Sequence, residues 1–152
     1  MKNSKPRVGF SLRSISTEQF AVIESAYSES STVRLTVGLD FGVDESSEVV
    51  SCVAKIEFKT EKGSFIVLHV RCDFSVKEDA WKEFNCVEDH TICLPKGFAS
   101  HLAVLTIGTA RGVLHAKTEN KKFNNFTLPT IDVTEIIKED VRMELNTSDT
   151  SL

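Results

Sequence analysis

The chain has 152 residues, of which 41% are hydrophobic and 26% are charged, and its formal net charge is −4. These values are ordinary for one globular domain, and the negative balance argues against a nucleic acid as the main partner. The basic start of the chain has no apolar run of signal-peptide length, and no stretch is apolar enough to span a membrane. We therefore expect a cytoplasmic protein that does not insert into membranes.

The segment 8–27 is apolar enough to supply one element of a sheet. Its large apolar residues are Phe10, Leu12, Ile15, Phe20, Val22 and Ile23. We expect the first strand to come from this segment. The triplet Thr17-Glu18-Gln19 also fits the start of a short helix, so the pattern leaves both structures open.

Three strands follow, because apolar residues alternate with polar ones over 33–41, 50–58 and 66–76. Turns are predicted at 44–48 and at 60–63, the second of which contains a glycine. The result is an antiparallel meander with one apolar face. The opposite face also carries apolar residues, for which we expect a cover: Val49, Val53, Phe65 and Val67.

The cysteines are expected to be reduced. Cys52 and Cys72 fall on the apolar face of the predicted strands, where cysteine packs as a small apolar residue. Cys86, His90 and Cys93 form a C-x3-H-x2-C pattern that could supply metal ligands. No second Cys/His pair follows at the spacing of a zinc site, so we interpret this stretch as a loop and predict no metal.

No sequence pattern predicts an enzyme. The four histidines lie in no local arrangement that joins a nucleophile, a base and an orienting group. Neither Gly63-Ser64 nor the glycines within 108–112 form a P-loop or a dinucleotide fingerprint. We predict no catalytic residues and no cofactor.

A long amphipathic helix is predicted over 100–117. Its apolar stripe consists of Ala103, Ile107, Ala110 and Leu114. A second stripe is made of small residues, Gly108, Gly112 and Ala116, although an interior glycine costs a helix roughly 1 kcal/mol relative to alanine. Two explanations remain open. Either the stripe permits a close helix contact between subunits, or it makes room for the chain's own sheet.

An aromatic loop and a second helix complete the pattern. Phe123, Phe126 and Leu128 precede Pro129, and alternating apolar residues in an extended loop display their side chains along one edge. Asp132 and Glu135 have the spacing of a capping box. A helix is predicted from Asp132 to about Leu145, with an apolar face of Val133, Ile136, Ile137, Val141 and Leu145.

The pair Ala110-Arg111 inside a helix, followed by FNNFTLPTIDVTEII at 123–137, resembles the C-terminal half of the SecB-type protein-export chaperones. In that family an Ala-Arg pair in the long helix precedes a Phe-x-x-Leu-x-Leu loop and a second helix. The resemblance implies an α+β fold with a four-stranded antiparallel sheet, a long helix and a C-terminal helix. We expect one SecB-like domain over 1–145, a flexible tail over 146–152, and a homotetramer built as a dimer of dimers.

By the same resemblance, the expected function is that of an ATP-independent holdase, which is not an enzyme and binds non-native polypeptides. Preproteins of the Sec export pathway are one client class, with the translocase motor as a further partner. A SecB-like chaperone of a toxin-antitoxin system and a small-ligand-binding α+β domain are the alternatives. The predicted client-binding residues are Phe20, Val22, Ile23, Phe123, Phe126, Leu128 and Ile137, and the predicted oligomer interface is Gly108, Gly112 and Ala116.

Overall fold

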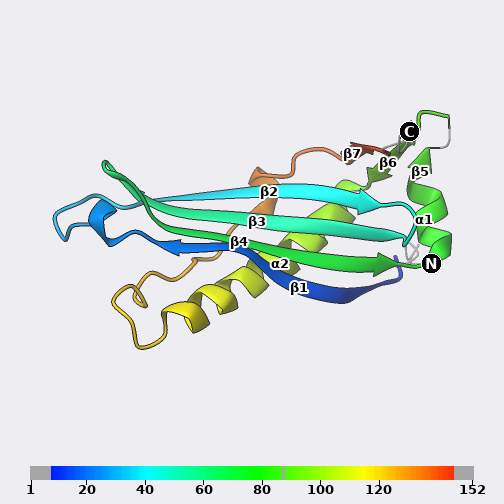
Figure 1. Cartoon of the computed structure of the whole chain (residues 1–152). Coiled ribbons are helices and arrows are strands. Elements are labelled where there is room, and N and C mark those ends of the chain that lie inside the picture. The colour runs from blue at the N-terminus through cyan, green and yellow to red at the C-terminus, as the bar shows by residue number, and fades with distance from the viewer. Residues whose placement is uncertain (1–7, 87, 146–152) are drawn as a thin grey trace, which may run out of the picture.

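Two antiparallel sheets and two α-helices make up the described part of the chain, which comprises residues 8–86 and 88–145 of a computed structural model (Figure 1). The larger sheet has the order β1-β4-β3-β2 and contains β1 (Phe10–Val22), β2 (Arg34–Asp44), β3 (Val49–Thr60) and β4 (Gly63–Val76). The smaller sheet has the order β5-β6-β7 and contains β5 (Asn85–Cys86), β6 (Thr91–Leu94) and β7 (Val141–Glu144). The helices are α1 (Glu78–Phe84) and α2 (Lys96–Thr118).

The segment left open by the sequence is a strand. β1 pairs antiparallel with β4 from Phe10 opposite Val76 to Val22 opposite Ile66, and Thr17-Glu18-Gln19 lies within it. The register shifts twice, between Leu12 and Ser14 and between Thr17 and Gln19. After a 3₁₀ turn, η1 (Glu24–Ala26), the chain crosses the end of the sheet to β2 at the opposite edge (Figure 1).

The three alternating strands and the turns between them are confirmed. Gly63 adopts a φ of 120° after the β3–β4 turn, a conformation that glycine adopts without steric cost. At the β2–β3 turn, the Asp44 carboxylate accepts hydrogen bonds from the Ser46 amide and hydroxyl. These local signals fix the register that places one set of alternating side chains on a single face.

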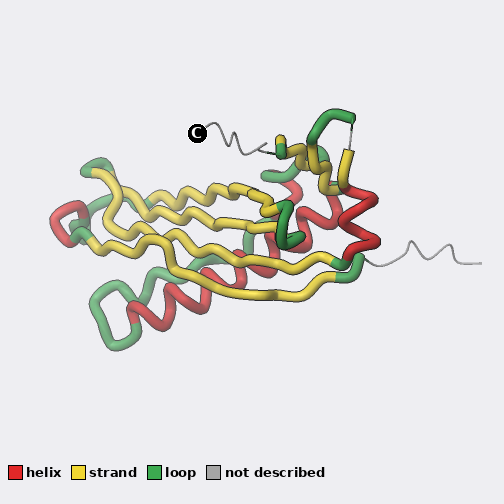
Figure 2. The backbone as a smooth tube through the Cα atoms, turned by 45° about the vertical axis from the view of Figure 1, so that its right-hand side comes forward, coloured by secondary structure: helices red, strands yellow, loops and turns green. Residues whose placement is uncertain are grey.

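Helix α2 packs on that face, where it contacts β3 and β4 (Figure 2). The side chains of these two strands that face α2 are fully buried or nearly so: Val50, Cys52, Ala54, Ile56, Ile66, Leu68, Val70, Cys72 and Phe74. The outer strands are covered less. On β2 the corresponding side chains are half-buried, while on β1 Leu12 and Ile15 are 49% and 51% exposed.

The segment after α2 covers the β2 side of the helix. Leu128, Val133 and Ile137 are each at most 7% exposed within the core. At the other end of the segment, the Asp140 carboxylate accepts a 2.8 Å hydrogen bond from the Lys96 amide and so caps the start of α2. The segment is therefore fastened along the length of the helix.

The prediction of a C-terminal helix from Asp132 to about Leu145 is wrong. Asp132 does act as a cap, accepting hydrogen bonds from the Thr134 amide and hydroxyl, but it opens a single 3₁₀ turn, η2 (Val133–Glu135). Further on, β7 pairs with β6. Val141, Met143 and Leu145 are less exposed than the residues between them, so the observed period is two and not 3.6.

The apolar patch expected on the far face of the sheet is corrected at one of its four residues, Phe65, while Val49, Val53 and Val67 keep the predicted side. Phe58 pairs with Ile66 and Lys59 with Ser64, so Phe65 is an extra residue in β4. This bulge re-aims the Phe65 side chain toward the aromatic residues on the helix side, where it is fully buried. In the described part of the chain no helix lies on the far face (Figure 2).

Helix α1 and strands β5 and β6 were not predicted from the sequence, and the stretch from Cys86 to Cys93 was interpreted as a loop. Trp81 and Phe84 of α1 and Ile92 and Leu94 of β6 are each at most 4% exposed. α1 has only seven residues, and β5 and β6 have two and four, too few for a periodic pattern to identify them.

Replacing Phe65 with alanine tests the bulge. Because the ring is buried among aromatic side chains, Phe65→Ala should lower the free energy of unfolding by about 3–5 kcal/mol. The control Val67→Ala, at a half-buried position of the same strand, should cost about 1 kcal/mol. Urea denaturation followed by Trp81 fluorescence measures both, and an equally small loss for Phe65→Ala would place its ring on the far face.

Candidate functional site

An aromatic cluster joins four segments at one end of the larger sheet. It consists of Tyr27, Phe58, Phe65, Phe123 and Phe126, whose contacting ring centroids lie 4.9–6.3 Å apart. Aromatic pairs at such separations favour tilted and edge-to-face packing, as seen here. Phe123 is only 3% exposed. The cluster therefore fixes the loop after α2 against the sheet.

Hydrogen bonds from α2 hold the same loop. Arg111 donates from Nε to the Leu128 carbonyl at 2.7 Å and from a terminal nitrogen to the Pro129 carbonyl at 2.8 Å. Asn124 donates to the Thr118 hydroxyl and to the His115 carbonyl at the end of the helix. The Ala-Arg pair thus has a structural explanation, since Ala110 is fully buried and Arg111 reaches the loop.

A groove lies between β1 and the end of α2. It has a volume of about 320 Å³ and is lined by Phe20, Val22, Glu24, Lys117, Thr118, Lys121, Lys122 and Phe123. Lys117 Nζ lies 5.4 Å from the centroid of the Phe20 ring, and Lys122 Nζ lies 5.4 Å from that of Phe123. Val22 is 40% exposed and its neighbour Ile23 is 43% exposed. The groove is therefore apolar along its floor and basic at its rim.

The predicted client-binding residues fall into two groups. Phe20, Val22 and Phe123 line this groove, and Ile23 follows Val22 directly. Phe126 lies in the aromatic cluster, and two further residues, Leu128 and Ile137, are buried under the C-terminal segment. Phe123, Leu128 and Ile137 are buried and cannot contact a client in this conformation, and Phe126 is half-buried in the cluster. The accessible candidates are therefore Phe20, Val22 and Ile23. The lysines that line the groove were missed by reasoning from apolar character alone.

The predicted interface residues lie on the uncovered flank of α2. Gly108, Gly112 and Ala116 are exposed, and a Cβ atom added at either glycine would meet nothing within 4 Å. The explanation that these glycines make room for the chain's own sheet is therefore wrong. Leu105, which is 40% exposed, lies on the same side of the helix.

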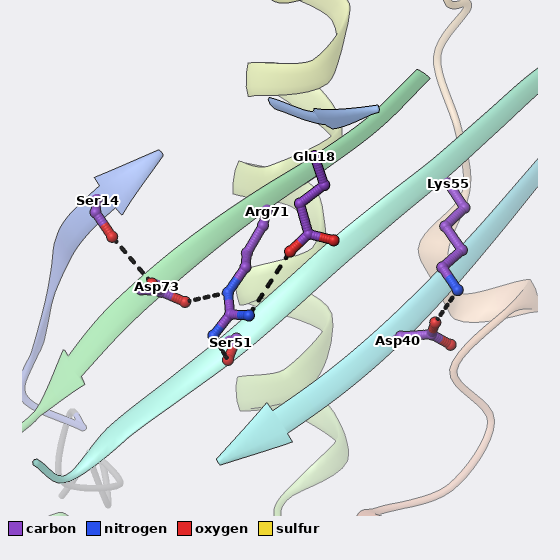
Figure 3. A network of polar contacts seen from close by, with 7 residues as sticks. All are labelled: Ser14, Glu18, Asp40, Ser51, Lys55, Arg71 and Asp73. Atoms are coloured by element: carbon purple, nitrogen blue, oxygen red, sulfur yellow. Dashed lines mark hydrogen bonds and ion pairs between the residues drawn. The ribbon is translucent and has the colours of Figure 1, made fainter. Parts of the chain in front are cut away.

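The far face of the sheet carries a polar network centred on Arg71 (Figure 3). Arg71 donates to Asp73 at 2.8 Å and to the Ser51 hydroxyl at 3.1 Å, and pairs with Glu18 at 3.6 Å. Burial acts to raise the pKa of Asp73, but hydrogen bonds from Arg71 and Ser14 outweigh it and hold the pKa below its ordinary value. The carboxylate is thus kept ionised as a structural acceptor.

A second pair on this face joins Lys55 Nζ to Asp40 at 2.6 Å (Figure 3). The hydrogen bond to Asp40 raises the pKa of Lys55. Because acids are matched by bases here, this face presents no electric field of a single sign.

The residues considered as metal ligands do not gather into one site within the part of the chain that the structure describes. Cys86 Sγ lies 3.8 Å from Asp89, but no three His, Cys, Asp or Glu side chains of the described residues converge on a point that could hold a metal. Cys52 and Cys72 are buried in the core as predicted, and burial raises the pKa of Cys52 to about 12. Neither helix within 8–86 and 88–145 is long and apolar enough to cross a membrane.

Comparisons with known proteins give distant similarities. No protein-family model and no curated protein sequence matches the chain. Among solved structures, a protein of unknown function from Streptococcus agalactiae is 14% identical with a TM-score of 0.37, covering 84% of this chain and 99% of that one. The Mycobacterium tuberculosis Rv1957 SecB-like chaperone, in complex with a ChAD peptide from Rv1956 HigA1 antitoxin, is 11% identical with a TM-score of 0.37, covering 81% of this chain and 91% of that one. Similarities at this level assign the chain to no family.

Removing Arg111 should release the loop after α2. Arg111→Ala breaks two charge-assisted hydrogen bonds, so we expect a loss of about 1–3 kcal/mol in unfolding free energy and faster amide hydrogen exchange over 126–133. The control Arg142→Ala removes an exposed pair with Asp89 and should change stability by less than about 0.5 kcal/mol. Unchanged exchange in the loop after Arg111→Ala would show that the aromatic cluster alone holds it.

Proposed function

We propose that this protein is an ATP-independent holdase that binds non-native polypeptides at the groove between β1 and α2. The carrying observation is the exposure of Val22 and Ile23, which lie next to the apolar floor formed with Phe20. A strip of apolar side chains on an edge strand fits an extended segment of an unfolded chain. A folded client hides such segments, so the groove discriminates by conformation.

The proposed mechanism is mass action. A protein that binds the unfolded form of a client and not its native form shifts the client's equilibrium away from folding, without any need for ATP. One groove offers few apolar contacts, so its affinity is weak. An assembly that presents several grooves to one long client gains affinity through effective concentration.

We propose that the exposed flank formed by β1 and α2 mediates this assembly, as a dimer of dimers in the cytoplasm. Leu12, Ile15 and Leu105 are each at least 40% exposed there, and Gly108 and Gly112 lie on the same flank of α2. Small residues on a helix let a second backbone approach closely, which offsets their cost in helix propensity. The resemblance in sequence supports preproteins bound for the translocase motor, or a partner of a toxin-antitoxin pair, as clients.

A refolding experiment tests the holdase. A slowly folding, chemically denatured client is diluted into buffer with the purified protein, and its refolding is followed by fluorescence. We expect a delay at stoichiometric amounts, and a clearly smaller delay with the double variant Val22→Ser/Ile23→Ser.

The matched control is Val104→Ser, which removes an apolar side chain that is 52% exposed on α2 outside the groove. It should delay refolding as the unmodified protein does. No delay by the unmodified protein would refute the proposed function, and an equal loss in the control would show that the groove is not the binding site.

A substitution at Gly112 tests the assembly surface. Gly112→Leu should lower the mass measured by light scattering, because a large side chain would block the close approach of a second helix. Gly97→Leu is the control, since Gly97 also lies in α2 with nothing within 4 Å of an added Cβ. If both variants keep the original mass, the small-residue stripe is not an interface.

A further inference from the structure

We propose that the groove selects client segments that combine apolar with acidic side chains. This inference rests on the proposed function, since it names the chemistry of the polypeptides that the groove would bind. It is carried by the charges at the rim, by their positions over the aromatic rings, and by their lack of partners in ion pairs.

The rim carries an excess of positive charge. Three of its side chains are basic, Lys117, Lys121 and Lys122, and one is acidic, Glu24, which leaves an excess of two positive charges. The chain as a whole has a net charge of −4. The groove is therefore opposite in sign to the protein that contains it, and a ligand that complements it carries carboxylates.

The lysines of the rim are not used in ion pairs within the described residues. Each ion pair found there joins other residues. Instead, Lys117 lies over the ring of Phe20, and Lys122 lies over the rings of Phe123 and Tyr27 at 5.4 and 5.9 Å. Such contacts restrain an ammonium group without neutralising it, and its N–H groups can still donate to a carboxylate.

The same contacts indicate which kind of client residue should neighbour the acidic one. An ammonium group that lies over a ring at the wall of an apolar groove is beside the space that an apolar side chain would fill. A client residue placed there excludes water from the ion pair next to it, which strengthens the pair. An acidic residue that directly neighbours an apolar one would satisfy both requirements.

A structural explanation of the lysines must be weighed against this proposal. Cations near the end of a helix stabilise it by interacting with its macrodipole. In the last turn of α2 the His115 carbonyl already accepts hydrogen bonds from the Thr118 hydroxyl and the Asn124 amide. Stabilisation of the helix would also not require the ammonium groups to lie over Phe20 and Phe123. Thermal melts distinguish the two roles of the lysines, because only a helix-stabilising role predicts a lower melting temperature when they are replaced.

A single-stranded nucleic acid is the other polyanion with an affinity for aromatic and basic surfaces. Such binding depends on free ring faces on which bases stack. Here ammonium groups already lie over the rings of Phe20 and Phe123, so these ring faces are not free for stacking. These observations favour a carboxylate-bearing polypeptide.

The test compares two labelled peptides of about twelve residues by fluorescence anisotropy. They share the same leucines and phenylalanines and differ in having either four aspartates or four lysines at the remaining charged positions. We expect the acidic peptide to bind more tightly, with a difference that shrinks at about 1 M NaCl, where charges are screened beyond about 3 Å. Lys121→Gln/Lys122→Gln should weaken its binding about fivefold, the sum of two modest exposed pairs.

Two further variants sharpen the test. Glu24→Gln removes the one acidic side chain of the groove and should strengthen binding of the acidic peptide about twofold. The control Lys82→Gln/Lys96→Gln removes the same charge from the far end of the molecule and should leave binding unchanged. Thermal melts of all variants should agree, whereas a role confined to the helix end would lower the melting temperature of Lys121→Gln/Lys122→Gln without changing the preference between peptides.

The outcomes separate the inference from the proposed function. Equal binding of both peptides, or tighter binding of the basic one, would overturn acidic selection and leave the holdase in place. Failure of both peptides to bind would overturn the holdase at this groove as well. Tighter binding of a labelled oligothymidylate than of the acidic peptide would overturn the inference in favour of nucleic acid.

Discussion

An α-helix about 10 Å wide cannot cover four strands spaced by about 4.8 Å, and α2 is the one helix on the face of the larger sheet in the described residues. It therefore buries the two central strands, β3 and β4, and leaves the edge strands β1 and β2 as two flanks that it does not cover. The β2 flank is covered by the segment after α2, fastened by Arg111 and by Asp140. Within the residues that the structure describes, no comparable segment covers the β1 flank, where Leu12, Ile15, Val22 and Leu105 are at least 40% exposed. Apolar side chains that a chain cannot bury by itself are available to other chains.

Client binding and self-assembly, as proposed above, both use the flank formed by β1 and α2. Along its middle, β1 and the small-residue stripe of α2 are suited to a second copy. At its end, where η1 leaves the sheet, the groove is suited to an unfolded segment. The aromatic cluster lies beside the groove, where its packing holds the loop after α2 in place. The cluster thus shapes the groove, whose lining includes its buried residue Phe123.

The parts of the fold that follow one period over many residues were predictable. Strands β2 to β4 and helix α2 each repeat their pattern several times, so a single exception does not obscure it. Phe65 shows the limit of assigning faces from alternating residues. One bulge moves its side chain to the other face, and no local sequence pattern predicts that bulge. The stretch from Val133 to Leu145 shows another, since Val133, Ile137 and Val141 fit a helix while Val141, Met143 and Leu145 fit a strand. Pairing with β6, a contact distant in sequence, decides between them.

The two register shifts of β1 bear on how far assembly can proceed. An edge strand with an unbroken ladder is a template on which strands can add without end, as in fibres. A bulge bends its strand and interrupts the row of evenly spaced donors and acceptors. Because β1 is interrupted near Arg13 and again near Glu18, a second chain finds only short regular runs along it. Such an edge favours a closed pair of protomers, held by side chains, over an open polymer held by backbone.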